Sequence, residues 1–396
     1  MKSKNNQHFE TMAIRTQTTR SQFGEHATPL YLTSSFVFRD SQHGSAMFAG
    51  EEDGYLYSRF SNPTCDEFVD KLCLMEGAET GISTATGMAA VFVTLASVLQ
   101  QGDHFIASRS LFGNTLHIIT NILPKWGIEY TLVDISEQDE WEKVVKSNTR
   151  LLFIETPSNP GLDLINLEKA NNLCKSKGLL FCVDNCFATP YLQKPIDFGA
   201  DIVIHSATKY LDGQGRVMGG AVLGRENWIS KAYEFLRRTG PSLSPFNAWV
   251  LSKSLETLAV RMDKHCENAL KLAEFLELHE EVDFVTYPFL PAFKQFDLAK
   301  KQMKQGGGLV SCDFKGGRDR GMKLLDALQM ISLTANLGDT RTIATHPSST
   351  THSKLTDAEL EKVGITKGLI RFSVGLEHID DIIRDIDLAI NASKNE

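Results

Sequence analysis

Short, nearly all-apolar segments alternate with stretches of helical periodicity from about residue 63 to residue 247. Seven apolar segments have the length and pattern of strands, at Thr80 to Thr84, His104 to Ser108, Glu129 to Val133, Leu151 to Glu155, Leu179 to Asp184, Asp201 to His205 and Gly219 to Leu223. Strands that are separated by helix-length segments need crossover connections, and these produce a mainly parallel sheet. The pattern therefore predicts an α/β domain over residues 63–247, built on a seven-stranded sheet.

The pattern changes at about residue 248, where long helical segments replace the regular alternation. The expected elements are helices at Ala248 to His265, Glu267 to Leu278 and near Met322 to Met330, strands at Leu309 to Phe314 and Leu369 to Val374, and a final amphipathic helix from about Ile379 to Ile390. An amphipathic helix covers a sheet with its apolar face. We expect a second, smaller α+β domain over residues 248–396.

Residues 1–62 show weak periodicity and many polar side chains, which predicts an extended arm rather than a domain. An arm without a core of its own stays ordered by lying on another surface, often that of a second subunit. Arg59 in this arm could contact a phosphate group. An exposed loop arginine is the alternative at that position.

Polar residues follow two of the predicted strands, and ligands of open α/β sheets bind at that edge. Asp184 ends one apolar segment, and Ser206, Thr208 and Lys209 follow the next. A lysine in a partly dry site loses proton affinity and can form a Schiff base with a carbonyl group. An aspartate that keeps a ring nitrogen protonated and hydroxyls that bind a phosphate would complete a site for pyridoxal phosphate. A solvated surface lysine is the simpler reading of Lys209.

Other strand ends carry weaker candidates. Gly87 and Met88 begin a helical segment whose main-chain amides could bind an anion, although a simple turn has the same sequence. Phe112 could stack on a planar ligand or belong to the core. Asn159 lies in a loop between two prolines and could bind a ring oxygen or only organise the turn. Arg371 is expected within a buried strand, so it needs a carboxylate partner, either internal or from a substrate.

Composition narrows the classes of function. The chain has 396 residues, 42% hydrophobic content and a net charge of −8, which argues against a nucleic-acid partner because such proteins need a basic face. The polar start of the chain and the lack of long apolar runs predict a cytoplasmic location. Seven scattered cysteines indicate free thiols. Cys182 and Cys186 have poor spacing for zinc on a strand, so no metal site is expected.

Several longer motifs carry a resemblance over nearly the whole chain. They are Val183-Asp184-Asn185, Ala188-Thr189-Pro190, Ser206-Ala207-Thr208-Lys209-Tyr210, Asp212-Gly213-Gln214-Gly215-Arg216, Ser108-Arg109-Ser110-Leu111-Phe112-Gly113, Asn336-Leu337-Gly338-Asp339 and Arg371-Phe372-Ser373-Val374-Gly375. Together they resemble the pyridoxal-phosphate enzymes of cysteine and methionine metabolism, which have fold type I. The motifs separate the members of that family less sharply than they identify it.

The resemblance implies roles for the candidates. Lys209 would hold the cofactor and move protons, Asp184 would keep the pyridine nitrogen protonated, and Arg371 would bind the substrate carboxylate, with Asn159 near the ring oxygen. The phosphate would be bound by Gly87, Met88, Ser206 and Thr208, joined by Tyr57 and Arg59 from a neighbouring subunit of a homotetramer built of dimers that share active sites.

Two departures from the family pattern affect the expected activity. Phe112 stands where many relatives have a tyrosine, so the ring is kept and its hydroxyl is lost; Tyr57 and Lys209 are the candidates to replace that proton donor. Asn336 stands where several relatives have a serine near the arginine. The resemblance implies γ-replacement on an activated homoserine ester, succinyl or acetyl, with sulfide. The alternatives are cysteine as the nucleophile, elimination without replacement, and a non-catalytic phosphate-binding scaffold.

Overall fold

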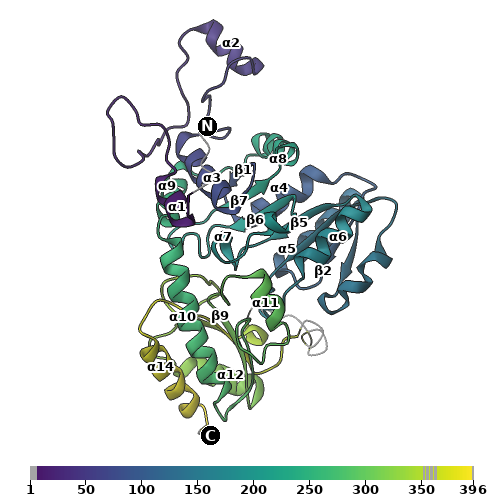
Figure 1. Ribbon diagram of the computed structural model, residues 1–396, viewed down its shortest axis with the longest axis vertical. Helices are drawn as coiled ribbons and strands as arrows, with labels where there is room; N and C mark the ends of the chain where they lie inside the picture. Colours follow the sequence, from purple (N-terminus) through teal and green to yellow (C-terminus); the bar gives the residue numbers. More distant parts are fainter. Residues whose placement is uncertain (1–6, 351–352, 354–355, 357–359, 361–363, 395–396) are drawn as a thin grey trace.

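The computed structural model describes residues 7–350, 353, 356, 360 and 364–394, and it contains two sheets (Figure 1). The first sheet has the strand order β1-β7-β6-β5-β4-β2-β3. β7 runs antiparallel to β1 and to β6, and the other neighbouring pairs are parallel. The strands are β1 Thr80–Thr84, β2 His104–Ser108, β3 Glu129–Val133, β4 Thr149–Glu155, β5 Leu180–Asp184, β6 Ile202–Ser206 and β7 Gly220–Gly224. The predicted seven-stranded, mainly parallel sheet is confirmed.

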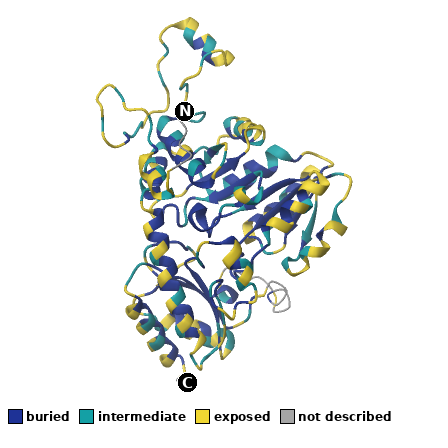
Figure 2. Cartoon of the chain, viewed as in Figure 1, coloured by how far each residue is buried: buried dark blue, intermediate teal, exposed yellow. Residues whose placement is uncertain are grey.

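Both faces of this sheet are covered, which explains why its strands read as continuous apolar runs. Phe105, Phe153 and Cys182 belong to one core cluster, which contains residues of the helices α4 Gly87–Val98 and α8 Glu226–Thr239. Ile106 and Val183 belong to a cluster on the opposite face, with residues of α6 Leu167–Lys177. Figure 2 shows the strands buried between these helices. Adjacent positions of one strand therefore both point into apolar surroundings.

The second sheet has the order β10-β11-β12-β9-β8. Its strands are β8 Val282–Thr286, β9 Leu309–Phe314, β10 Ser332–Leu333, β11 Ile343–Thr345 and β12 Leu369–Ser373. Apolar side chains from α10 Leu258–Glu277, α12 Gly317–Ala327 and α14 Ile379–Ala392 share one core cluster with residues of this sheet. The remaining helices of seven residues or more in this half are α9 Pro245–Leu255 and α11 Phe296–Gln302, among the described residues.

Some predicted boundaries in this half were wrong. The helix break lies at Glu256 and Thr257, between α9 and α10, and not between His265 and Glu267. At the break the carbonyl group of Ser254 accepts hydrogen bonds from the main-chain N–H of Thr257 at 3.2 Å and from the Arg261 guanidinium at 3.0 Å. Further along, the helix predicted near Met322 to Met330 is α12 Gly317–Ala327, which starts earlier and ends at Ala327, because Leu328 has extended dihedral angles.

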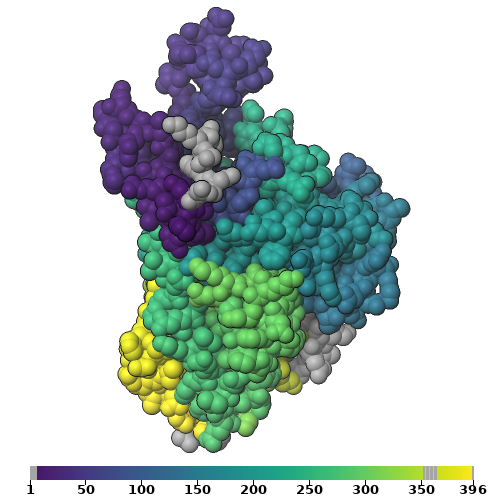
Figure 3. Space-filling model, viewed as in Figure 1, coloured from purple at the N-terminus to yellow at the C-terminus, as the bar shows by residue number. Residues whose placement is uncertain are grey.

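The arm leaves the body of the molecule and contains the short helices α1 Phe9–Arg15 and α2 Ser41–Ala49 (Figures 1 and 3). Its large apolar side chains Phe23, Leu32, Val37 and Phe48 are exposed in the single chain. We propose an arm over residues 1–62 and domains over 63–247 and 248–396, because the two sheets fall in separate ranges. No helix among the described residues is long and apolar enough to cross a membrane.

A buried polar cluster fixes the arm to α3 Pro63–Glu76, and we call it the arm anchor. It consists of Thr28, Glu67, Lys71, Ser252 and Glu256. The Glu67 carboxylate accepts hydrogen bonds from the hydroxyls of Thr28 and Ser252, and it lies 3.2 Å from Lys71 Nζ. Lys71 also reaches Glu256 at 3.2 Å. Each charge in the arm anchor therefore has a partner of opposite sign.

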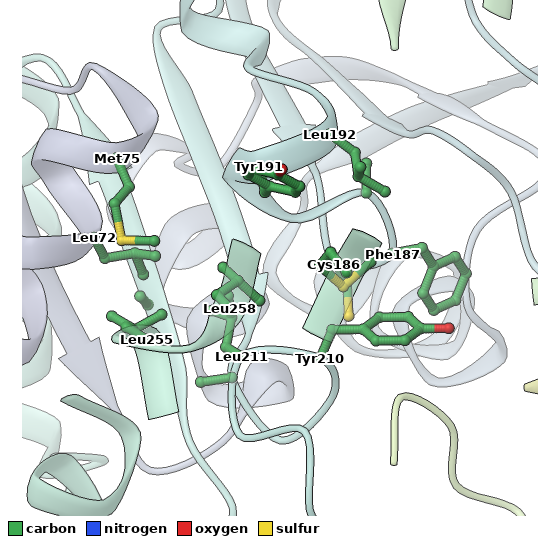
Figure 4. Packing of buried hydrophobic residues seen from close by; sticks show 14 of the residues in the cluster. Leu72, Met75, Cys186, Phe187, Tyr191, Leu192, Tyr210, Leu211, Leu255 and Leu258 are labelled. Atoms are coloured by element: carbon green, nitrogen blue, oxygen red, sulfur yellow. The ribbon is translucent and has the colours of Figure 1, made fainter. Parts of the chain in front are cut away.

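The loops that follow β5 and β6 rest on a packed core. Figure 4 shows Cys186, Phe187, Tyr210 and Leu211 from these loops, which share one core cluster with Leu258 and with residues of α3 and α9. Packing of this kind leaves side chains few alternative rotamers. The residues at the carboxyl edge of the first sheet therefore stand on a rigid base.

Candidate active site

Two carboxyl groups lie side by side at the carboxyl edge of the first sheet. Asp184 ends β5, Glu155 ends β4, and their Cα atoms are partners in the parallel ladder. The Asp184 carboxylate accepts a hydrogen bond from the main-chain N–H of Cys186 at 3.1 Å. Burial raises the pKa of Asp184 to about 6 and raises the pKa of Glu155 well above its ordinary range. Glu155 had no role in the sequence prediction, although its position at a strand end was visible.

Lys209 lies in the turn after β6, beside the strand that carries Asp184. Its main-chain carbonyl accepts from the N–H of Gly213 at 2.8 Å, which closes the turn. The side-chain amine donates a hydrogen bond to Asn336 Oδ1 at 2.7 Å. Desolvation lowers the pKa of the Lys209 amine, and the nearby positive charge of Arg371 lowers it further, against a rise from Cys186. A partly buried amine of this kind suits nucleophilic and basic chemistry.

Arg371 lies in β12 of the second sheet and is 4% exposed. Its guanidinium donates to Asn159 Oδ1 at 2.9 Å, to the main-chain carbonyl of Asn336 at 3.2 Å and to the hydroxyl of Thr345 at 3.4 Å. Its Nε has no hydrogen-bond partner, and no Asp or Glu of the described residues forms an ion pair with it. Burial lowers the pKa of Arg371 to about 10. An internal carboxylate partner is therefore not found.

The loop that carries Asn336 contacts both halves of the site. Asn336 binds Lys209 with its side chain and Arg371 with its main chain. Two residues later, Gly338 adopts a left-handed φ of +77°, and its N–H donates to the hydroxyl of Ser373 at 2.8 Å. A Cβ atom on Gly338 would lie 2.7 Å from the Tyr210 nitrogen. Only glycine fits this close approach between the loop and the turn of Lys209.

The start of α4 lies against the end of β6 and offers main-chain N–H groups of the kind that bind anions. The Thr86 hydroxyl accepts from the N–H of Ala89 at 3.0 Å and caps this 12-residue helix. The N–H groups of Gly87 and Met88 precede the first intrahelical bond and have no carbonyl partner within the helix. A Cβ atom on Gly87 would lie 2.5 Å from the Ser206 Cβ, so glycine is needed there. Thr208 follows, with its hydroxyl hydrogen-bonded to the main chain of Gly219.

Phe112 precedes the short helix α5 Gly113–His117, and 42% of the residue is exposed. Its main-chain N–H donates to Glu155 Oε2 at 2.8 Å. The bond ties the loop of Phe112 to the edge that carries Asp184. An exposed ring next to two polar strand ends is available for stacking on a flat ligand.

The arm residues Tyr57 and Arg59 lie elsewhere in the single chain. Arg59 donates to the main-chain carbonyl of Arg237, at the end of α8, and its guanidinium lies 4.8 Å from the centre of the Phe60 ring. Tyr57 is 43% exposed. Neither forms a hydrogen bond with the other predicted site residues in this chain. A role for them needs a second subunit, as the sequence prediction assumed.

The donor set fits pyridoxal phosphate. A partly buried amine with a lowered pKa suits its aldehyde group, an acid without an ion-pair partner suits a protonated ring nitrogen, and free amides at a helix start suit its phosphate. Among the described residues no group of three or more His, Cys, Asp or Glu side chains could hold a metal ion. The seven cysteines are free and buried, which confirms the expectation of free thiols.

Comparison with known proteins gives relatives along almost the full chain. An O-succinylhomoserine sulfhydrylase of Pseudomonas aeruginosa is 45% identical over 378 residues, which are 96% of this chain and 94% of the relative. An L-methionine gamma-lyase of Porphyromonas gingivalis is 43% identical and covers 96% of both chains.

A solved structure of similar fold comes from Campylobacter jejuni. It is described as an O-acetylhomoserine (thiol)-lyase with N′-pyridoxyl-lysine-5′-monophosphate, and its TM-score is 0.93 at 36% identity, covering 97% of this chain and 100% of that chain. The family model for Cys/Met metabolism PLP-dependent enzymes matches residues 10–391. This chain therefore belongs to the pyridoxal-phosphate-dependent enzymes of cysteine and methionine metabolism, and it has their fold type I architecture.

Proposed function

We propose that this enzyme catalyses γ-replacement on O-succinyl-L-homoserine or O-acetyl-L-homoserine, with sulfide as the nucleophile and L-homocysteine as the product. The observation that carries the proposal is the buried guanidinium of Arg371, which lacks a carboxylate partner and shares one loop with the Lys209 amine. An amino-acid substrate would bring its α-carboxylate to the first group and its Cα to the second. The reaction belongs to methionine biosynthesis.

The residues would divide the work as follows. Pyridoxal phosphate, when bound, supplies an electron sink for carbanion chemistry. Lys209 would hold it covalently and, once freed by the substrate amine, would remove the proton from the substrate Cα. The lowered pKa of the Lys209 amine favours the neutral form that can take this proton.

Asp184 would hold the proton of the pyridine nitrogen, and Phe112 would stack on the ring. Gly87, Met88, Ser206 and Thr208 would bind the phosphate, and Asn159 would orient the Arg371 guanidinium to which it is hydrogen-bonded, close to the ring oxygen.

Proton transfer to the leaving group needs a donor other than a tyrosine at position 112. The amine of Lys209 is protonated after it has taken the Cα proton, and it can donate that proton at another atom of the substrate. Tyr57 of a neighbouring subunit is the second candidate for the proton donor. The leaving carboxylate departs from the γ-carbon with its bonding electrons, and the sulfide sulfur forms the new bond at the same carbon. The net change is exchange of a carboxylate for a thiol.

The test is an assay of the purified holoenzyme with O-succinylhomoserine and O-acetylhomoserine, each offered sulfide or cysteine. We expect homocysteine as the main product with sulfide, and the faster ester identifies the physiological leaving group. Cystathionine formed faster from cysteine than homocysteine from sulfide would assign the other nucleophile and contradict the proposal.

Elimination is the second candidate, because the relatives include methionine γ-lyases at 43% identity. The phenylalanine at position 112 argues against it, since the lyase pattern has a tyrosine there. Incubation with L-methionine alone tests this alternative. Release of methanethiol and a 2-oxo acid at a rate equal to the sulfide reaction would favour the lyase.

We also propose a homotetramer built of dimers that share active sites. The exposed apolar side chains of the arm support an assembly, because large exposed apolar surfaces mark interaction sites. Tyr57 and Arg59 would reach the phosphate of the neighbouring site. Mixed refolding of R59A chains with K209A chains should give dimers with one intact site and recover activity that neither variant has. No recovery in the mixture would place Arg59 in the site of its own chain.

A further inference from the structure

Glu155 is a buried acid that none of the roles above uses. It is 4% exposed, and its side chain lies on the same face of the sheet as that of Asp184, since paired positions of parallel strands point the same way. Phe153 and Cys182, two residues earlier on each strand, also pair and share one core cluster. The sheet therefore brings two carboxyl groups together at the edge where the cofactor ring is expected.

No lysine or arginine among the described residues forms an ion pair with either acid. Two neighbouring carboxylates without a cation cannot both ionise at ordinary pH, so the pair keeps one proton. Asp184 is the better site for the negative charge, because the Cys186 N–H donates to it and the charge of His205 favours its ionised form. For Glu155 burial and the charge of Asp184 both favour the neutral acid.

The second contact of Glu155 is with the loop that carries the aromatic ring. Its Oε2 accepts from the main-chain N–H of Phe112 at 2.8 Å. A neutral carboxyl group accepts this bond through its carbonyl oxygen and keeps its O–H available for another acceptor. Glu155 thus connects the acid expected under the ring nitrogen with the residue expected to stack on the ring.

We propose that Glu155 is a positioning residue: it stays uncharged beside ionised Asp184 and fixes the main chain of Phe112, so that the cofactor ring meets a single negative charge. The inference rests on the cofactor placement given under Proposed function. It does not depend on which substrate or nucleophile the enzyme uses.

The surroundings of the pair contain few other titratable groups. Cys186 follows Asp184 and feels the charges of Asp184, Lys209 and Glu155, but burial keeps its thiol neutral by raising its pKa. His205 on β6 is paired with the buried Glu76 of α3 at 2.9 Å. Burial also raises the pKa of Glu76 and lowers the pKa of the Lys209 amine, so the comparison of E155Q with the wild type isolates the titration of Glu155.

The first test measures urea unfolding of the cofactor-free full chain as a function of pH. A carboxyl group whose pKa is raised on folding contributes stability below its unfolded value, and this stability is lost as the pH rises above 4.5 through the folded pKa. E155Q removes that titration, so its stability should fall less than that of the wild type between pH 5 and pH 8, roughly the range that follows from the raised pKa.

The matched control is E67Q, at an equally buried glutamate of the arm anchor. The pKa of Glu67 is lowered by its hydrogen bonds to Thr28 and Thr18 and by the charge of Lys71, although burial acts in the opposite direction. The stability from Glu67 is present above its unfolded pKa and is lost as the pH falls. E67Q should therefore lose most stability at neutral pH, the opposite sign to E155Q.

The second test measures pyridoxal phosphate binding to the cofactor-free protein at pH 7 by absorbance titration. Glutamine is neutral and keeps an acceptor for the Phe112 N–H, so E155Q should bind within about threefold of the wild type. E155L leaves that N–H without a partner and should bind about tenfold more weakly or worse. D184N should weaken binding and serves as the reference for loss of the charge.

The proposal is overturned if E155Q binds pyridoxal phosphate as poorly as D184N, or if its stability has the same pH dependence as the wild type. If E155Q does not fold, infrared difference spectra of the wild-type protein across pH replace it. The carbonyl band of a protonated buried carboxyl group at neutral pH, absent from E155L, supports the proposal; its absence from the wild type contradicts it.

Discussion

The arm anchor and the candidate active site are both buried polar clusters, but they treat charge differently. In the arm anchor Lys71 lies 3.2 Å from both Glu67 and Glu256, Glu256 also pairs with Lys253, and hydroxyls bind the Glu67 carboxylate. In the site Lys209 has only an amide oxygen as partner, and Arg371 has an unpaired Nε. Satisfied networks stabilise a fold, whereas an unsatisfied buried group at the edge where ligands bind can be satisfied by the ligand. The arm anchor therefore has the character of a structural cluster, and the candidate active site has the character of a binding site.

Lys209→Ala should have the largest effect, because it removes both the covalent link and the proton carrier. We expect kcat to fall by about 10⁴ or more, since a positioned acid or base alone contributes 10²–10⁴. Borohydride reduction followed by peptide mass spectrometry should find the pyridoxyl group on Lys209 in the wild type. A pyridoxyl adduct on another lysine would place the attachment point elsewhere.

Arg371→Lys tests the role of a buried arginine whose guanidinium has an unpaired Nε, and Arg261, whose guanidinium is bound by carbonyl groups, provides the comparison. Lysine cannot make the paired hydrogen bonds of a guanidinium to a carboxylate, so kcat/KM should fall by about 10²–10³ with little loss of fold. The control is R261K. Arg261 is also buried, and its guanidinium is bound to the carbonyl groups of Tyr210, Leu211 and Ser254. R261K should lower stability and leave kcat/KM of the folded enzyme nearly unchanged.

Lys71→Met tests whether the arm anchor contributes to stability and not to catalysis. Removal of one partner from a buried ion pair leaves uncompensated charge and should lower the free energy of unfolding by about 3–5 kcal/mol. Urea unfolding measures the loss, and kcat of the remaining folded enzyme should stay close to the wild type. A large drop in kcat without loss of stability would show that the anchor belongs to the catalytic machinery.

The pH dependence of cofactor binding follows from the raised pKa of Asp184, about 6, which is caused first by burial. Below this pH the acid is neutral and no longer attracts a protonated ring nitrogen. Affinity for pyridoxal phosphate should therefore fall as the pH drops, by about tenfold between pH 7 and pH 5. Absorbance titration at several pH values measures it, and D184N should show weak binding without this dependence.

Phe112→Tyr should have the smallest effect. Phe112 is 42% exposed, so we expect room for an added hydroxyl in the single chain. It would add a proton donor near the leaving group and should change kcat by less than about tenfold, with more 2-oxo acid relative to homocysteine. The product ratio measures this. An unchanged ratio would mean that Lys209 or Tyr57 already controls the partition.

The sequence was sufficient for the strands of the first sheet, since most of them are buried on both faces and have apolar runs, and helix-length segments also separate the partly exposed β1 and β3 from their neighbours in the chain. β8 and β10 were missed because their residues are half-exposed or exposed, and β11 because it has three residues. The helix break at Glu256 was missed because the apolar periodicity runs through it. These are places where tertiary contacts, and not local pattern, decide the structure.

The site was predictable where residues are adjacent along the chain. The placement of Asp184 and Lys209 at one edge followed from the order of two strands. The contact between Asn159 and Arg371 joins residues 212 positions apart, and no sequence pattern indicates it. Glu155 was placed correctly at a strand end, but its importance depends on the in-register neighbour Asp184 and on Phe112, and both relations need the sheet.

Gly338 touches the turn of Lys209 on one side and, through Ser373, the strand of Arg371 on the other. This contact, which leaves no room for a side chain at position 338, therefore helps to set the distance between the Lys209 amine and the Arg371 guanidinium. A larger residue at position 338 would increase that distance and so change which amino-acid substrates can reach both groups at once.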